Sequence, residues 1–333
     1  MAEMDQIVGM VVAGIKTMQP PRLKLPMSVV DLKRYGPNGS DLPAAPAAAR
    51  RYCRRLARTH YENFWVGHVF LPRRLRQHVA NIYAYCRWAD DLADESESPR
   101  QSLALLNWWE RELRACYAGQ TRHPVFVALA ETIEAFAVPI DPMIDLLVAF
   151  RQDQRVVRYE TFDDLLGYCR YSANPVGRLV LHLGRCATPD RAQLADRVCT
   201  GLQLVNFWQD VARDFDRGRV YLPQFDCRRF GYGESDFAAR RANDAFRRLL
   251  ASEVEQAESY LRQGAALVPK MPRALRLQVS LFVEGGLALA EAIRRRQYDV
   301  WTQRPRLSTI DKLRVFAHCW WTLPREPPIE SRE

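Results

Sequence analysis

Three polar residues at helical spacing give the strongest chemical signal in the chain. Asn206, Asp210 and Asp214 follow one another at steps of four residues. On an α-helix this spacing places all three on one face, each about 6 Å above the last. Asp90 and Asp94 repeat the same step earlier in the chain. Carboxylate and amide oxygens suit Mg²⁺, which usually binds one or two carboxylates together with substrate phosphates. The two stretches therefore predict a pair of helices that hold Mg²⁺ and, through it, a diphosphate.

The residues around these acids separate a metal site from an ordinary solvated helix face. Asp90 and Asp94 lie among apolar residues such as Ile82 and Trp88, but a pattern this short is also common on surfaces. The second stretch is more specific because its polar positions alternate with Leu, Val, Phe and Trp. Unpaired acids in such a setting are costly. Both stretches together favour a functional site.

Departure of a diphosphate would leave a carbocation, which needs a dry pocket with aromatic faces. Phe64, Tyr83, Tyr168 and Phe207 are the candidates, although each of these residue types, taken alone, is more often plain core. Arg87 lies one turn before Asp90 and is a candidate phosphate contact, with an intrahelical ion pair as the alternative.

The elements that must position these residues are all helical. The chain has 333 residues, of which 48% are hydrophobic, enough for one large core. No run of alternating strand residues and no repeat period is evident. The fold prediction is a single-domain, all-α bundle. The expected helices span 47–58, 74–95, 101–117, 125–137, 141–150, 191–215, 237–264, 273–296 and 308–320.

Two further features mark boundaries. Thr161 is a predicted helix cap, and Pro175 after Asn174 predicts a break or kink in the helix that follows. Residues 1–50 are rich in Pro and Gly and are expected to be a loosely ordered leader before a domain at 51–333. Met27 is a candidate natural start.

Charge and cysteine content bound the partners and the compartment. The net charge of +9 suits anionic partners, but no nucleic-acid-binding signature is present. The eight cysteines form no metal-ligand pattern, which favours reduced thiols and a cytoplasmic location. The same net charge favours peripheral contact with the inner face of an anionic cytoplasmic membrane. Cys319-Trp320-Trp321 is a candidate interfacial anchor, with ordinary packing as the alternative.

Longer motifs resemble a known family. ADDLADE at 89–95, YCRYSANPVG at 168–177 and QLVNFWQDVARDFDRGRVYLP at 203–223 are similar to the squalene/phytoene synthase family, and the resemblance covers roughly residues 55–305. It implies a class I isoprenoid synthase bundle with a central cavity. HYENF at 60–64, LPRRLR at 71–76 and SANPVG most resemble the branch that forms hydroxysqualene in the bacterial hopanoid pathway.

The resemblance assigns roles to individual residues. It implies metal binding by Asp90 and Asp94 on one helix and by Asp210 and Asp214, with Asn206, on the other. Two or three Mg²⁺ ions are expected. Substrate contacts are implied, beside the pocket residue Phe64, for His60, Tyr83, Arg87, Tyr168, Gln203, Asn206 and Arg294, and Tyr168 is also a catalytic candidate. Gln209 departs from the family, because many relatives place an Arg there.

The implied reaction converts presqualene diphosphate to hydroxysqualene, with release of diphosphate and capture of the cation by water. A sister enzyme would supply presqualene diphosphate from farnesyl diphosphate. NADPH is not expected, since no GxGxxG motif is present and a water-quenched product needs no reductant. The alternatives are head-to-head condensation to presqualene diphosphate, squalene or phytoene, a terpene cyclase, and a non-catalytic helical interaction protein.

Overall fold

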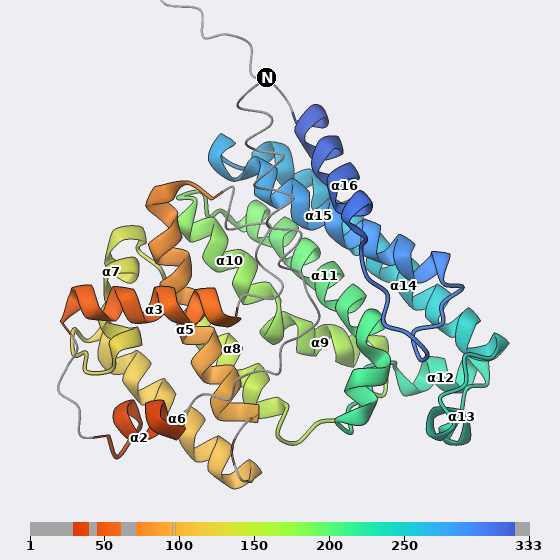
Figure 1. The fold of residues 1–333 in the computed structure, drawn as a ribbon, viewed down its shortest axis with the longest axis horizontal. Coiled ribbons are helices and arrows are strands. Elements are labelled where there is room, and N and C mark those ends of the chain that lie inside the picture. The colour runs from red at the N-terminus through yellow and green to blue at the C-terminus, as the bar shows by residue number, and fades with distance from the viewer. Residues whose placement is uncertain (1–28, 40–44, 61–70, 95, 97, 324–333) are drawn as a thin grey trace, which may run out of the picture.

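The computed structural model describes residues 29–39, 45–60, 71–94, 96 and 98–323, and the regular elements in these ranges are helices (Figure 1). An isolated parallel bridge between Arg158 and Val220 is the one β interaction recorded in the described part. The all-α prediction is therefore confirmed. The elements are α2 (Val29–Tyr35), α3 (Pro46–His60), α5 (Arg73–Asp94), α6 (Pro99–Tyr117), α7 (Pro124–Phe136), α8 (Asp141–Gln152), α9 (Phe162–Ser172), α10 (Asn174–Leu183), α11 (Pro189–Asp216), α12 (Gln224–Phe230), α13 (Glu234–Ala238), α14 (Asp244–Gly264), η1 (Ala265–Lys270), α15 (Arg273–Arg295) and α16 (Thr309–Thr322).

Most helix boundaries follow local capping signals in the sequence. Thr161 caps α9 through a capping box with Asp164, and Ser308 caps α16 in the same way with Asp311. The predicted break at Pro175 is also present, because α9 ends at Ser172 and α10 begins at Asn174. Short side-chain hydrogen bonds thus fix these ends before any tertiary packing.

The predicted helix at 237–264 is wrong as a single element. The structure divides it into α13, which ends at Ala238, and α14, which begins at Asp244. Asn243 caps α14 by accepting a hydrogen bond from the Phe246 amide at 2.9 Å. Arg240 adopts a positive φ of 50°, which no helix accommodates. An Asn side chain that binds nearby backbone in this way favours the start of a new helix, so the two elements are separate.

Part of the predicted leader is also an ordered part of the fold. Residues 29–35 form α2, and α3 begins at Pro46. The Tyr35 ring packs against Tyr52 and His123, with centroid separations of 5.5 and 5.8 Å. The remainder of the leader that is not described includes Met27, so the predicted start lies outside the described residues.

Two large hydrophobic clusters of buried side chains make up most of the core in the described part of the bundle. One joins α3 and α5–α8 around the buried rings of Trp88 and Trp109, and the other joins α9, α11, α14 and α15 around Trp208. Helices α11 and α14 approach each other closely, because a Cβ on Gly264 would lie only 2.6 Å from Val198 Cγ2. This tight packing fixes α11, the helix that carries the second acidic motif.

None of the described helices is long and apolar enough to cross a bilayer.

Candidate active site

The two acidic motifs lie on α5 and α11, and Arg219 connects them. Asp90 and Asp94 occupy the last turns of α5, and Asp210 and Asp214 the last turns of α11. After α11 the chain turns at Gly218, whose φ of +74° suits glycine. Arg219 then donates to Asp94 Oδ1 through Nη2 at 3.3 Å, while its backbone amide donates to the Asp214 carbonyl at 2.8 Å. The structure therefore brings together the ends of both predicted motifs.

The arginines near Asp214 do not fully balance the cost of a negative charge on its carboxylate. Burial raises the pKa of Asp214 to about 7, and the neighbouring Asp210 carboxylate adds to the effect, although Arg217, Arg219 and Arg213 oppose it. A carboxylate that is hard to ionise despite three nearby arginines is a place where additional positive charge would be favourable. A divalent cation supplies such charge.

Asp210 is paired with a cation from a distant part of the chain. Arg304, in the segment between α15 and α16, donates to both Asp210 carboxylate oxygens, with 2.9 Å from Nη2 to Oδ2. Gln209 stabilises this arrangement: its Oε1 accepts from Arg304 Nη2 at 2.8 Å, and its Nε2 donates to the Pro305 carbonyl at 2.6 Å. The Gln209 amide thus orients an Arg that comes from a segment 95 residues further along the chain.

Asp153 and Tyr168 form a buried pair beside the two motifs. The Tyr168 hydroxyl donates to Asp153 Oδ2 at 3.1 Å. Burial raises the pKa of Asp153 to about 6, whereas Arg219 and the Tyr168 hydrogen bond act in the opposite direction, and Asp94 and Asp90 raise it further. Four charged groups, Asp153, Arg219, Asp94 and Asp90, therefore share one region, and the predicted catalytic residue Tyr168 lies within it.

An aromatic wall lines the same region. The Phe207 and Tyr221 rings stack at a centroid separation of 3.8 Å and an angle of 11°. Tyr168 lies 6.2 Å from Phe207 and 6.0 Å from Tyr221, and Tyr159 extends the group behind Tyr168. These ring faces have the quadrupole that favours a carbocation.

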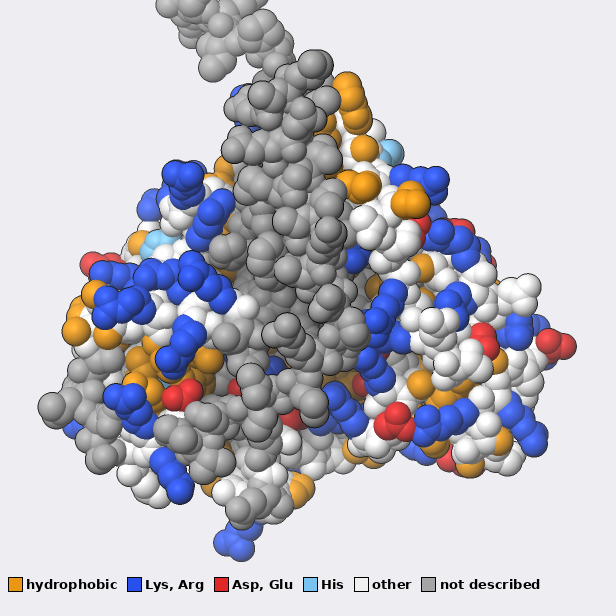
Figure 2. All heavy atoms as spheres, viewed as in Figure 1, with side chains coloured by type: hydrophobic (Ala, Val, Ile, Leu, Met, Phe, Trp, Pro, Cys, Tyr) orange, Lys and Arg blue, Asp and Glu red, His pale blue; other side chains and the backbone are white. Residues whose placement is uncertain are grey.

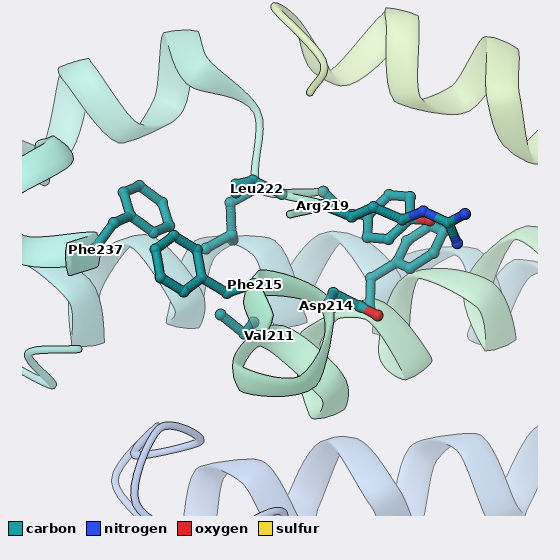
Figure 3. A pocket seen from close by; sticks show the side chains of 9 residues that line it. Val211, Asp214, Phe215, Arg219, Leu222 and Phe237 are labelled. Carbon is teal, nitrogen blue, oxygen red and sulfur yellow. The ribbon is translucent and has the colours of Figure 1, made fainter. Parts of the chain in front are cut away.

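A small cavity of about 10 Å³, with room for roughly one water molecule, lies between the aromatic wall and the end of α11. Figure 3 shows Asp214 and Arg219 toward one end of it and Phe215 and Phe237 toward the other. Charged side chains and apolar side chains therefore meet at this cavity.

Several predicted substrate contacts have protein partners. Arg87 pairs within its own helix with Asp91, and also with Asp90 at 3.3 Å, which is the intrahelical alternative considered from the sequence. Arg294 pairs with Glu258 at 2.9 Å and with Glu291 at 2.6 Å. Their roles toward a substrate stay predictions.

The structure describes only some of the remaining predicted substrate contacts. Asn206 is exposed and Gln203 half-buried on α11, while Tyr83 is half-buried on α5. His60 is the last residue of α3, and its side chain is not described. Phe64 lies outside the described residues.

The acidic residues fit Mg²⁺ bound together with a diphosphate, but not a metal held by protein alone. Among the described residues, no three His, Cys, Asp or Glu side chains converge closely enough to hold a metal ion. Mg²⁺ needs only one or two carboxylates when phosphate oxygens complete its shell. Asp90 and Asp94 on α5, and Asp210 and Asp214 on α11, would supply those carboxylates.

Sequence reasoning missed Asp153, Arg219, Tyr221 and Arg304. Arg219 and Tyr221 are within the GRVYLP tail of the second motif, so a cation and an aromatic residue directly after the acids were available as signals. Asp153 and Arg304 carry no local signal, because their neighbours in the site come from other helices.

Comparisons with known proteins give consistent matches. The family model described as squalene/phytoene synthase matches residues 57–311. Phytoene synthase from Arthrospira platensis is 30% identical over 288 residues, covering 81% of this chain and 92% of that protein. The solved squalene synthase HpnC from Alicyclobacillus acidocaldarius is 44% identical, with a TM-score of 0.73 over 76% of this chain and 95% of that one. A dehydrosqualene synthase solved with a ligand is 26% identical, with a TM-score of 0.75 over 84% and 97% of the two chains.

Proposed function

The chain belongs to the squalene/phytoene synthase family, and we propose that it converts presqualene diphosphate to hydroxysqualene with release of diphosphate. The observation that carries the proposal is the joining of both acidic motifs by Arg219 beside the wall of Phe207 and Tyr221. The 44% identity to a squalene synthase, together with the HYENF and SANPVG motifs, supports the C30 branch.

The proposed site has a polar end for the diphosphate and an aromatic end for the carbon chain. Magnesium, when bound by the two aspartate pairs, supplies Lewis-acid stabilisation of the leaving diphosphate. Arg219 and Arg304 are placed to share that negative charge, since both already bind carboxylates of the two motifs. As the C–O bond breaks, the rings of Phe207, Tyr168 and Tyr221 face the cationic carbon chain and exclude bulk water. One water then gives its oxygen to the cation and releases a proton.

The expected partners follow from this reaction. Presqualene diphosphate would come from a sister synthase acting on farnesyl diphosphate, and functional coupling to that enzyme is part of the proposal. NADPH is not required, because capture by water adds no electrons. A cytoplasmic enzyme in peripheral contact with the membrane would suit its hydrophobic product.

The second candidate is head-to-head condensation, giving presqualene diphosphate or squalene from farnesyl diphosphate, or phytoene from geranylgeranyl diphosphate. The 30% identity to phytoene synthase favours it. A non-catalytic helical interaction protein that keeps the acidic helices is the alternative outside enzymes.

Product analysis by mass spectrometry separates these functions. Purified protein with Mg²⁺ receives presqualene, farnesyl or geranylgeranyl diphosphate, each with and without NADPH. Hydroxysqualene from presqualene diphosphate without NADPH is the expected result. Presqualene diphosphate, squalene or phytoene from the shorter substrates would assign the condensing reaction instead.

Two variants test whether the acidic helices are catalytic. Asp90→Asn and Asp210→Asn should each lower turnover by about 100- to 1,000-fold, because each removes charge that stabilises the leaving group. Asp163→Asn, at an exposed acid in the first turn of α9, is the matched control and should retain activity. A folded wild type without turnover on any of the three substrates would favour the interaction protein.

A further inference from the structure

Helix α16 concentrates exposed hydrophobic side chains. In the described part of the chain six large hydrophobic residues are exposed, and three of them, Ile310, Trp320 and Trp321, belong to this 14-residue helix. Their exposed fractions are 61%, 42% and 69%. Figure 2 shows hydrophobic side chains along α16, with basic side chains nearby. Exposed Trp is uncommon on a surface that contacts only water.

The opposite face of α16 is anchored to α15, so the exposed face has a fixed orientation. Near the start of the helix, Asp311 pairs with Arg295 at 3.1 Å. Near its end, Cys319 is fully buried and lies within hydrogen-bonding reach of Ser280. Ser308 completes a capping box at the first turn. These contacts hold α16 as a ridge on the molecule.

The exposed residues form one stripe with a particular composition. Ile310, Arg314, Ala317 and Trp321 follow one another at steps of four, three and four, which places them on one helix face. Trp320 lies beside this stripe and stacks on Phe316 at 6.0 Å. A stripe of Ile, Arg and Trp is typical of helices that lie in a membrane interface.

The exposed charge on the stripe itself is positive, because Arg314 is its one charged residue, whereas Glu284 of α15 is half-buried near Cys319 on the anchored side. Asp311 is the sole acidic residue in the sequence of α16, and its carboxylate is taken up by Arg295 and by the helix cap. The Trp end of α16 points toward the start of α15, because Cys319 meets Ser280 there. Exposed Arg273, in the first turn of α15, lies about 10 Å of helix length from Ser280. The surface therefore combines aromatic and cationic groups without an exposed acid on α16.

We propose that the α16 face, defined by Ile310, Arg314, Ala317, Trp320 and Trp321, docks on an anionic phospholipid surface. The cations attract the lipid headgroups, and the indole rings enter the headgroup boundary, where an apolar body and a polar N–H are both satisfied. The chain's net charge of +9 acts in the same direction. A protein partner would more often bring a complementary acid or an apolar groove, whereas a lipid surface matches both features of the stripe. This docking does not depend on which reaction the protein catalyses.

Flotation with vesicles tests the proposal on the full chain. Wild type should float with vesicles containing 30% phosphatidylglycerol (about one lipid in three) at low salt, and less with vesicles of phosphatidylcholine alone. Trp320→Ala/Trp321→Ala should weaken binding by more than about tenfold, because two large ring systems lose their contact with lipid. Arg314→Gln should weaken it by about fivefold, the equivalent of one cation near an anionic surface.

The matched control is Phe225→Ala, which removes an equally exposed aromatic ring, 55% exposed, from α12. It should bind vesicles as the wild type does. Brominated phospholipids should quench part of the wild-type tryptophan fluorescence and should not quench the double variant, which keeps six of the eight Trp residues.

Three results would overturn the proposal. One is a wild type that does not float, and another is a double variant that floats as well as the wild type. The third is a wild-type dimer, seen by light scattering, that the double Trp variant converts to a monomer, since the face would then bind a second copy of the chain. Activity in detergent, measured for the same variants, should be unchanged, and this keeps the docking test separate from the test of the reaction.

Discussion

The Gln209 amide tethers the segment that carries Arg304 to α11, so Gln209→Leu tests how the second acidic motif is built. The side chain is buried, and it accepts from Arg304 Nη2 at 2.8 Å and donates to the Pro305 carbonyl at 2.6 Å. Loss of a charge-assisted hydrogen bond costs about 1.5–3 kcal/mol and loss of a neutral one about 0.5–1.5 kcal/mol. Burial of the extra apolar atoms of Leu stabilises the fold by about 1 kcal/mol and offsets part of this loss. The free energy of unfolding should therefore fall by about 1–3 kcal/mol.

Two assays measure the consequence. Urea unfolding should show the lower free energy directly, and the melting temperature should fall by about 2–4 °C for each kcal/mol in a chain of this order of size. Product formation should also slow. Arg304 keeps its bonds to Asp210 in the variant but loses the group that orients it, so kcat/KM should decrease by about 10- to 100-fold.

Gln193→Leu is the matched control, because Gln193 is an exposed amide on the same helix. Its effect on unfolding should stay within about 0.5 kcal/mol. If Gln209→Leu were as stable and as active as this control, the Arg304 segment would not depend on the tether. The proposed construction of the motif would then be wrong.

Three further perturbations probe the fold and the site. Burial and a neighbouring carboxyl raise the pKa of Glu253 to about 8, so the folded protein holds a proton that the unfolded chain has lost. Stability should therefore fall as pH rises from about 4.5 to about 8. In urea unfolding at pH 5 and pH 9, Glu253→Gln should flatten this decline. Gly264→Ala should lower the free energy of unfolding by about 1–3 kcal/mol, because the added methyl crowds α11. Gly167→Ala, on a helix with open space around that residue, should raise it by about 0.5–1 kcal/mol. Equal shifts in melting temperature would contradict the close approach of α11 and α14. Tyr168→Phe removes the hydroxyl that stabilises the Asp153 carboxylate, so the pKa of Asp153 should rise above about 6 in an NMR titration, and an unchanged value would place the hydrogen bond elsewhere.

The local interactions that begin and end several helices can be predicted from the sequence. Thr161 and Ser308 begin helices because a hydroxyl and a nearby Asp satisfy the first amides, and Pro175 ends one helix and opens the next because it lacks an amide hydrogen. The four-residue steps of Asp90–Asp94 and Asp210–Asp214 needed only the helical period. The same reasoning failed at one place: the prediction continued a single helix through Arg240 and Asn243, where the backbone turns.

The sequence by itself therefore determined the all-α class, most helix boundaries and the two acidic faces, because each depends on residues within one or two turns. Only the tertiary structure decided which charges meet. Arg304 binds Asp210, 94 residues away, and Arg219 binds Asp94, 125 residues away. Tyr168 donates to Asp153, and Arg87 pairs with acids of its own helix. Those pairings depend on how α5, α8, α11 and the segment after α15 pack together, and helical periodicity carries no information about that packing.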